Sequence, residues 1–174
     1  MRSEIAVAMD AKRIADLVNA AYRSVSGRRG WTHEADLIAG ERTRWKDVAA
    51  MIANTSTTVL VRRSDNSSAV LACVAVEMNG ASRCTISMLA VAPELQAAGL
   101  GRDLLADAEQ FAANRGVTSA KITVVEQRET LIAWYERRGY RQTGSHEAFP
   151  YGTDSVGTPL RDDLRFAILE KTIF

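Results

Sequence analysis

One stretch of the sequence, residues 87–105, constrains the fold more than any other. It reads SMLAVAPELQAAGLGRDLL, which predicts a strand, a short loop containing Pro93, a turn interrupted by glycines and an amphipathic helix. The first N–H groups of a helix have no partner within the helix, and the helix dipole adds partial positive charge there. Gly99 and Gly101 permit backbone conformations that let a bulky ligand come close. The stretch therefore predicts a site for a phosphate or diphosphate group.

The spacing of the glycines distinguishes this predicted anion site from two common phosphate-binding motifs. A dinucleotide-binding fingerprint needs Gly-x-Gly-x-x-Gly, and the third glycine is missing after Gly101. A nucleotide P-loop needs Gly-Lys-Ser/Thr at its end, which is also missing. What remains, Gln96-x-x-Gly99-x-Gly101 after a strand at 89–91, resembles the acetyl-CoA diphosphate loop of the GNAT acyltransferase superfamily. The alternative, a glycine-rich helix start that binds no ligand, stays open on this pattern alone.

A second segment strengthens the resemblance. Residues 131–140 read LIAWYERRGY and resemble the later helix of the same superfamily, with Tyr135 at the family's tyrosine position. Gly139 is placed to end that helix, as a C-terminal glycine does. The predicted strand, loop, helix, strand, helix and glycine follow the family's order, so the resemblance covers residues 57–174 well and residues 1–56 loosely.

The composition and element pattern predict one α/β domain. The chain has 174 residues, of which 47% are hydrophobic and 25% charged, as is usual for a globular domain with a full core. We predict strands at 5–9, 57–63, 69–78, 83–91, 121–125, 140–147 and 165–173. We predict helices from a cap at Asp10 to the break at 27–30, over 37–52 (with a division at Gly40 left open), at 99–115 and at 129–138, and a long loop at 149–163. The connections imply a mixed, mostly antiparallel central sheet of about seven strands with helices on both faces, in a single GNAT-like acetyltransferase domain at 1–174.

The charge pattern excludes several classes of partner. The net charge is +1, and the basic residues are scattered among 21 acidic ones, which is not the pattern of a nucleic-acid-binding protein. We expect no membrane partner, because no apolar run approaches the length of a membrane span, and a cytoplasmic location, because the N-terminus lacks a signal-peptide pattern. A metal site is not expected, because the chain has no CxxC motif and two histidines, His33 and His146.

The two cysteines are expected to be reduced and buried. A two-residue Asn-Gly turn at 79–80 would pair Cys73 with Ile86 and Cys84 with Ala75, so that the two sulfur atoms do not face each other. Each cysteine is then a small apolar core residue.

The resemblance implies where acetyl-CoA would bind. The backbone of Leu89, Ala90 and Val91 would hold the pantetheine arm in an opening between two splayed strands, and a backbone N–H there would polarise the thioester carbonyl. The diphosphate would be held by the N–H groups of Gln96, Ala97, Ala98, Gly99, Leu100, Gly101 and Arg102. Ordinary sheet pairing is the alternative for the strand, and a solvated surface position is the alternative for the Arg102 side chain.

The resemblance also implies catalytic roles. Tyr135 would be the general acid that protonates the leaving thiolate, the alternative being a tyrosine that only packs beside Trp134. Many family members have asparagine where this chain has Arg128, whose side chain would reach the CoA phosphates or point into solvent. Glu77 is the candidate general base, with Glu126 and Glu34 as the other candidates and a solvated surface charge as the alternative for each.

The acceptor would be bound by two further segments. Residues 30–37, GWTHEADL, would line the acceptor pocket, with Trp31 packing and Glu34 binding a cation, and they would also suit a helix start capped by Thr32. Glu126 is a further candidate for binding the acceptor amine. The 149–163 loop would cover the site, with Tyr151 and Asp154 touching substrate.

The sequence thus predicts an acetyl-CoA-dependent N-acyltransferase that acts on a primary amine of a small molecule or amino acid. The amine would attack directly in a ternary complex, because neither cysteine is placed as a nucleophile. Two alternatives remain, a non-catalytic acyl-CoA-binding module and a protein or peptide N-acetyltransferase. The resemblance makes a homodimer an assembly to consider, although the sequence shows no interface.

Overall fold

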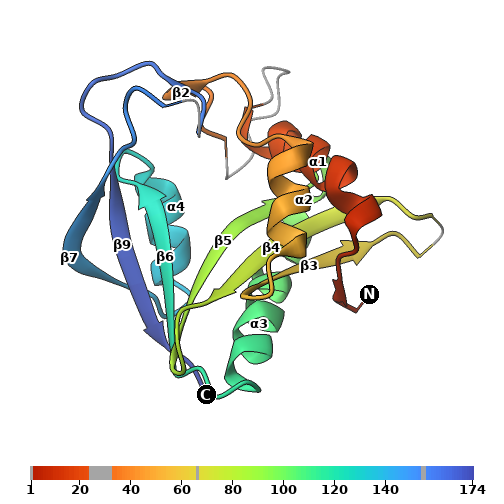
Figure 1. Cartoon of the computed structure of the whole chain (residues 1–174). Coiled ribbons are helices and arrows are strands. Elements are labelled where there is room, and N and C mark those ends of the chain that lie inside the picture. The colour runs from red at the N-terminus through yellow and green to blue at the C-terminus, as the bar shows by residue number, and fades with distance from the viewer. Residues whose placement is uncertain (1, 24–32, 66, 154–155) are drawn as a thin grey trace.

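A seven-stranded sheet forms the centre of the molecule (Figure 1). The computed structural model describes residues 2–23, 33–65, 67–153 and 156–174. Over these residues the sheet order is β1-β3-β4-β5-β6-β9-β7, and every neighbouring pair is antiparallel except β5 and β6. The strands are β1 (Glu4–Ile5), β3 (Thr57–Arg63), β4 (Val70–Met78), β5 (Arg83–Val91), β6 (Ser119–Val125), β7 (Arg141–Ala148) and β9 (Arg165–Thr172). The mixed, mostly antiparallel sheet predicted from the sequence is confirmed.

Helices cover both faces of this sheet, as predicted. Helices α1 (Ala11–Arg23) and α2 (Trp45–Ala53) pack on one face, and α3 (Leu100–Ala113) and α4 (Glu129–Glu136) pack on the other. Two 3-10 helices, η1 (Ala8–Asp10) and η2 (Pro93–Ala98), lead into α1 and α3. A separate ribbon of β2 (Ile38–Ala39) and β8 (Thr158–Pro159) lies at the upper edge in Figure 1. None of the described helices is long and apolar enough to cross a lipid bilayer.

Strand β4 shows why the sheet needs both layers of helices. Alternate residues of a strand point to opposite faces, so a strand covered on both sides is apolar at nearly every position. In β4, Val74 and Val76 join the core under α3, whereas Cys73 and Ala75 join the core under α1 and α2. Its sequence VLACVAV is accordingly a continuous apolar run.

The sheet opens between β5 and β6. These two parallel strands pair only where Arg83–Thr85 lie beside Ser119–Lys121, and they then diverge. Strand β6 continues instead in full register with β9, from Ser119 to Val125. Figure 1 shows the resulting V-shaped gap between the β3–β5 part and the β6–β9 part of the sheet.

The hairpin between β4 and β5 differs from its prediction. The N–H of Asn79 bonds the carbonyl of Arg83 (2.8 Å), so the turn spans 80–82 instead of two residues. Cys84 therefore lies opposite Met78, and Cys73 lies opposite Ala90. The register that we predicted for the cysteines was wrong, but both are buried and free, as expected.

Three further segments differ from the elements predicted for them. The strand predicted at 5–9 is two residues long, because the chain turns into η1 at Ala8. The helix predicted over 37–52 begins only at Trp45, since Gly40, with φ of 81°, follows the short strand β2. The 149–163 loop contains β8, which pairs with β2.

Asp10 was predicted to cap α1, but its carboxylate instead bonds the backbone before η1 and an arginine of β3. The carboxylate is buried, accepts a hydrogen bond from the Val7 N–H (2.9 Å) and pairs with the Arg63 guanidinium (2.7 Å). The hydrogen bond from Arg63 lowers the pKa of Asp10 below its ordinary value. A carboxyl whose pKa is lowered by folding stabilises the protein above its unfolded pKa, and this stabilisation is lost as the pH falls through the folded value.

We predict that Asp10→Asn lowers the free energy of unfolding by about 2 kcal/mol at neutral pH, because it breaks a buried ion pair. The difference from wild type should shrink below about pH 4, where the wild-type carboxylate is also protonated. Urea unfolding at pH 7 and pH 3 measures both. Asp16→Asn, on an exposed pair with Lys12 in the same helix, is the control and should change stability by less than about 0.5 kcal/mol. Equal losses in the two variants would contradict the role given to Asp10.

Candidate active site

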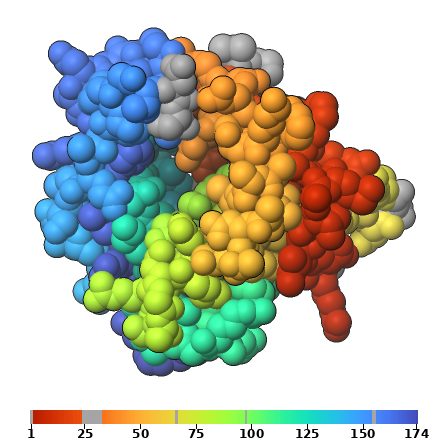
Figure 2. Space-filling view, viewed as in Figure 1, coloured from red at the N-terminus to blue at the C-terminus, as the bar shows by residue number. Residues whose placement is uncertain are grey.

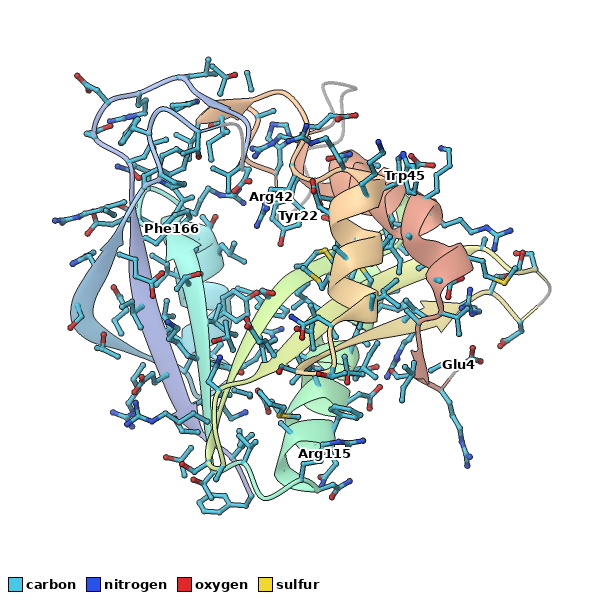
Figure 3. All side chains as sticks on the ribbon, in the orientation of Figure 1. Glu4, Tyr22, Arg42, Trp45, Arg115 and Phe166 are labelled. Atoms are coloured by element: carbon cyan, nitrogen blue, oxygen red, sulfur yellow. The ribbon has the colours of Figure 1, made fainter. Side chains whose placement is uncertain are left out.

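A cavity of about 240 Å³ lies where β5 and β6 diverge. Residues 86–89 of β5 and 122–125 of β6 form two of its walls. Side chains from α1, α4 and the 34–42 segment line the rest, together with Arg128, Val156 and Phe166. In Figure 2 the surface is hollowed between the blue C-terminal part and the orange segment that leads into α2. Figure 3 shows Tyr22 and Arg42 on one side of this opening and Phe166 on the other.

Strand β5 carries a bulge at the cavity. The pairing with β4 shifts by one residue between Ala75–Ser87 and Cys73–Ala90, and Met88 takes a positive φ of 54°. A bulge leaves one residue unpaired and redirects the backbone, and bulges are common beside active sites. Because β5 has no partner in β6 beyond Thr85, its free edge here can accept an extended ligand as an added strand.

The predicted strand residues divide at this bulge. Leu89 lines the cavity, and its carbonyl accepts a hydrogen bond from the Tyr22 hydroxyl (3.0 Å). Ala90 and Val91 are buried and paired with β4, opposite Cys73 and Ala72, and they lie outside the cavity lining.

Tyr135 of α4 lines the cavity beside β6. Its ring is buried and makes edge contacts with Trp134 (5.0 Å between centroids) and Tyr140 (5.7 Å). Burial, with a smaller contribution from Tyr22, raises the pKa of Tyr135 well above its ordinary value. The phenol therefore keeps its proton at neutral pH, which suits a proton donor.

The turn before α3 has the geometry of an anion site. Gly99 adopts a left-handed conformation (φ 79°), and the N–H of Asp103 is bonded to its carbonyl (3.1 Å). The N–H groups of Leu100, Gly101 and Arg102 precede this first bonded turn and therefore point out of the helix. The Gln96 side chain ties the turn to β5 by donating to the Val91 carbonyl (3.1 Å). This donor set, at the positive end of a 14-residue helix, fits a diphosphate.

Two arginines add positive charge beside this turn. Arg102 is exposed, pairs with Asp103 (2.8 Å) and lies 3.3 Å from the position that a Cβ on Gly99 would take. Arg138 lies over the Trp134 ring (3.4 Å), and its pKa is lowered by burial and then by the charges of Arg137 and Arg102. Arg138 was not predicted as a site residue, although its position three residues after Tyr135, in the turn that follows α4, was a usable signal.

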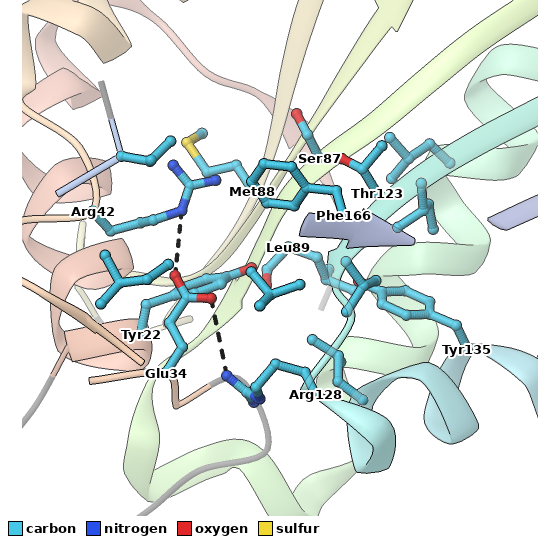
Figure 4. Close-up of a pocket in the computed structure, with 17 residues that line it drawn as sticks. Tyr22, Glu34, Arg42, Ser87, Met88, Leu89, Thr123, Arg128, Tyr135 and Phe166 are labelled. Carbon is cyan, nitrogen blue, oxygen red and sulfur yellow. Dashed lines mark hydrogen bonds and ion pairs between the residues drawn. The ribbon is translucent and has the colours of Figure 1, made fainter. Parts of the chain in front are cut away.

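Glu34 lies in the cavity wall, surrounded by arginines. Its buried carboxylate is 3.0 Å from the Arg23 guanidinium, 3.7 Å from that of Arg42 and 4.0 Å from that of Arg128. Figure 4 shows Glu34 between Arg42 and Arg128, with Tyr135 across the cavity beyond Leu89. Arg128 is buried here, so the solvated alternative for its side chain was wrong.

Other predicted site residues lie elsewhere. Glu77 is exposed on β4, opposite Thr57 and Thr85, and it is outside the cavity lining, so the structure does not bring the candidate base to Tyr135. Trp31 and Asp154, like the predicted cap Thr32, lie outside the described residues.

Glu126 and Tyr151 are engaged outside the cavity lining. The Glu126 carboxylate pairs with Arg165 (2.8 Å) and His146 (2.9 Å), and the hydrogen bond from Arg165 lowers the pKa of Glu126. The Tyr151 hydroxyl donates to the Arg161 carbonyl (3.1 Å) and accepts from the Leu164 N–H (2.7 Å). Among the described residues, no group of three or more histidine, cysteine, aspartate or glutamate side chains is placed to hold a metal ion.

Comparisons with known proteins agree with this fold. The model of a family described as acetyltransferase (GNAT) domain matches residues 39–152. No curated protein sequence is similar enough to count as a match. The chain belongs to the GNAT acetyltransferase family.

Solved structures with low sequence identity share the fold. The ribosomal-protein-S18-alanine N-acetyltransferase from Escherichia coli has a TM-score of 0.72 at 18% identity, over 99% of this chain and 93% of that one. Nourseothricin acetyltransferase has a TM-score of 0.68 at 18% identity, over 99% and 98%. A GNAT family acetyltransferase from Elizabethkingia anophelis with acetyl-CoA bound has a TM-score of 0.61 at 18% identity, over 80% and 90%.

We predict that Glu34→Gln lowers the free energy of unfolding by about 3 kcal/mol, because three arginines would then face one another without a carboxylate. Urea unfolding at neutral pH measures this loss. Glu41→Gln, an exposed change nearby in the same segment, is the control and should have little effect. Unchanged stability in Glu34→Gln would show that the carboxylate does not hold this wall together.

Proposed function

We propose that this protein transfers an acetyl group from acetyl-CoA to the primary amine of a small molecule or amino acid. The observation that carries the proposal is the cavity at the β5–β6 opening, with the Met88 bulge on one wall and the buried, protonated Tyr135 on another. The proposal includes a single catalytic domain at 1–174 and a cytoplasmic place of action, both carried over from the sequence.

The residues present fit acetyl-CoA at both of its ends. The N–H groups of residues 100–102 at the start of α3 would hold the diphosphate, with the charges of Arg102 and Arg138 beside them. The open edge of β5 near Leu89 would hold the pantetheine arm. When bound, acetyl-CoA supplies an activated acetyl group as a thioester.

The chemistry then needs two contributions from the protein. The acceptor nitrogen attacks the thioester carbonyl carbon, so that a C–N bond forms as the C–S bond breaks. A backbone N–H at the Met88 bulge would stabilise the charge on the carbonyl oxygen. The Tyr135 hydroxyl gives its proton to the departing sulfur, and the proton lost by the amine leaves through water and restores the phenol.

Direct attack by the amine is favoured over an acyl-enzyme. Both cysteines lie outside the cavity lining, and burial raises the pKa of Cys73 to about 12 and that of Cys84 to about 11. Neither thiol would be a thiolate at neutral pH, and the thiolate is the nucleophile.

We predict that Tyr135→Phe lowers kcat about 100-fold, because it removes the proton donor, while the Kd for CoA stays nearly unchanged. Thiol release with a panel of amines measures kcat, and calorimetry measures CoA binding. The matched control is Tyr140→Phe, which removes the same hydroxyl from the neighbouring buried ring outside the cavity lining. If both variants keep full turnover, Tyr135 is not the acid.

We predict that Gly99→Ala raises the Kd for CoA at least tenfold, because the new Cβ is strained at this φ and crowds Arg102 at the diphosphate turn. Gly116→Ala is the matched control, since Gly116 has a similar φ of 85° at the far end of α3 and open space around it. It should be equally strained but bind CoA normally in calorimetry. Equal affinities of the two variants for CoA would show that this turn does not bind the diphosphate.

CoA binding without acetylation of any amine in the panel would instead favour a non-catalytic binding module. Acetylation of peptides alone would favour a peptide N-acetyltransferase.

A further inference from the structure

The cavity carries an excess of positive charge on the side away from Tyr135. Among the described residues that line it, the charged ones are Glu34, Arg42 and Arg128, and Arg23 lies directly behind Glu34. Three guanidinium groups thus surround one carboxylate. Uncompensated charge is costly in a buried site, so a further anion would be favoured there.

The carboxylate of Glu34 forms its shortest ion pair with the buried Arg23. Arg23 holds it at 3.0 Å, and the same guanidinium donates to the carbonyls of Ile38 (3.1 Å) and Val156 (2.7 Å). Arg42 is farther from the carboxylate, at 3.7 Å, which is outside ordinary hydrogen-bond distance. Glu34 therefore forms a neutral pair with Arg23 and leaves the charge of Arg42 available to a ligand.

The backbone of Arg42 is fixed, whereas its side chain remains accessible. Its N–H donates to the Asn19 side-chain oxygen of α1 (2.7 Å), and the Asn19 amide donates to the Thr43 carbonyl (2.9 Å). The guanidinium lies 5.7 Å from the centroid of the Tyr22 ring, and its side chain is 31% exposed. A planar guanidinium held in this way is suited to bind a carboxylate through two hydrogen bonds.

We propose, building on the function proposed above, that the acceptor is an amine that also carries a carboxylate, such as a free amino acid, and that Arg42 binds this carboxylate. The amine would then lie toward Leu89 and Tyr135, across the cavity from the arginines (Figure 4). The remaining wall is formed by Ile38, Met88 and Phe166, which suits a small apolar side chain. Polyamines and other purely cationic acceptors are disfavoured by repulsion from Arg42 and Arg128.

The test compares each amino acid with its C-terminal amide, which has the same size and a primary amine but no carboxylate. We expect kcat/KM, from thiol release with acetyl-CoA, to be at least about tenfold higher for the best free acid than for its amide. The amide amine is less basic, so more of it is unprotonated at neutral pH, and reactivity alone would favour the amide. Equal or better use of the amides would overturn the proposal and point to a peptide N-terminus as acceptor.

Variants then assign the effect to one side chain. Arg42→Gln should lower kcat/KM for the free acid at least about tenfold and leave the amide within about twofold, because only the acid loses a partner. Arg42→Lys should retain part of the preference, since it keeps the charge. The matched control is Arg44→Gln, because Arg44 is exposed, pairs with Asp47 and lies outside the cavity lining. A loss shared equally by acid and amide would show that Arg42 is only structural.

A binding experiment separates this proposal from the proposed function. In the presence of CoA, calorimetry should show tighter binding of an N-acetylated amino acid than of its amide, and Arg42→Gln should abolish the difference. If this holds while no amine is acetylated, the catalytic proposal fails and carboxylate binding stands. If amides are turned over and no carboxylate preference appears in either experiment, catalysis stands and the acceptor class is wrong.

Discussion

The short contact between β5 and β6 is the constraint on which the rest of the structure depends. Three residues of β5 lie in register with three of β6, after which the strands diverge. An unpaired strand edge in a protein interior is unfavourable unless something bonds to it. Here the edge of β5 opens onto a cavity. Beside the cavity the backbone of β5 is bulged at Met88, and the Tyr22 hydroxyl donates a hydrogen bond to the Leu89 carbonyl. The gap in hydrogen bonding that weakens the sheet is also the place where a ligand can complete it.

The charged wall connects stability with recognition. Glu34 and Arg23 are both almost fully buried, so each needs the other, and their pairing fixes segment 34–42 against α1. Arg42 lies on that segment, Asn19 holds its backbone N–H, and its side chain lines the cavity. A site that must distinguish two amines of equal size gains most from such a fixed charge, because the wrong ligand leaves it unpaired.

The elements predicted best from the sequence were those whose information is local. The turn before α3 depends on Gly99 and on a helix start, and helix α4 depends on apolar spacing, so both could be predicted from short segments. The Met88 bulge could not, because it arises from the register between β4 and β5, which the misjudged Asn79 turn had shifted. The candidate base Glu77 was placed by its position along a strand, which does not say whether a side chain reaches a cavity.

The arginine wall was missed for a related reason. Tyr22 lies on α1, where apolar spacing predicts that its ring packs in the core but not that its hydroxyl bonds β5. Arg42 lay within a segment predicted as helix, where a charged residue is read as solvent-facing. Glu34 was expected in the wall of a pocket and does line the cavity, but a sequence does not reveal how many cations will surround one carboxylate after folding.

The place of β9 in the sheet has a consequence for how the protein is made. This strand pairs along the whole of β6, which β5 contacts over three residues only, and it separates β6 from β7. Proteins are synthesised from the N-terminus, so residues 4–125 can leave the ribosome while one wall of the cavity still lacks its main neighbour. Strands β3–β5 pair with one another and are synthesised first. Strands β6 and β7 both pair with β9, so their pairing requires residues 165–172. The cavity is thus completed only after residues 165–172 have been synthesised.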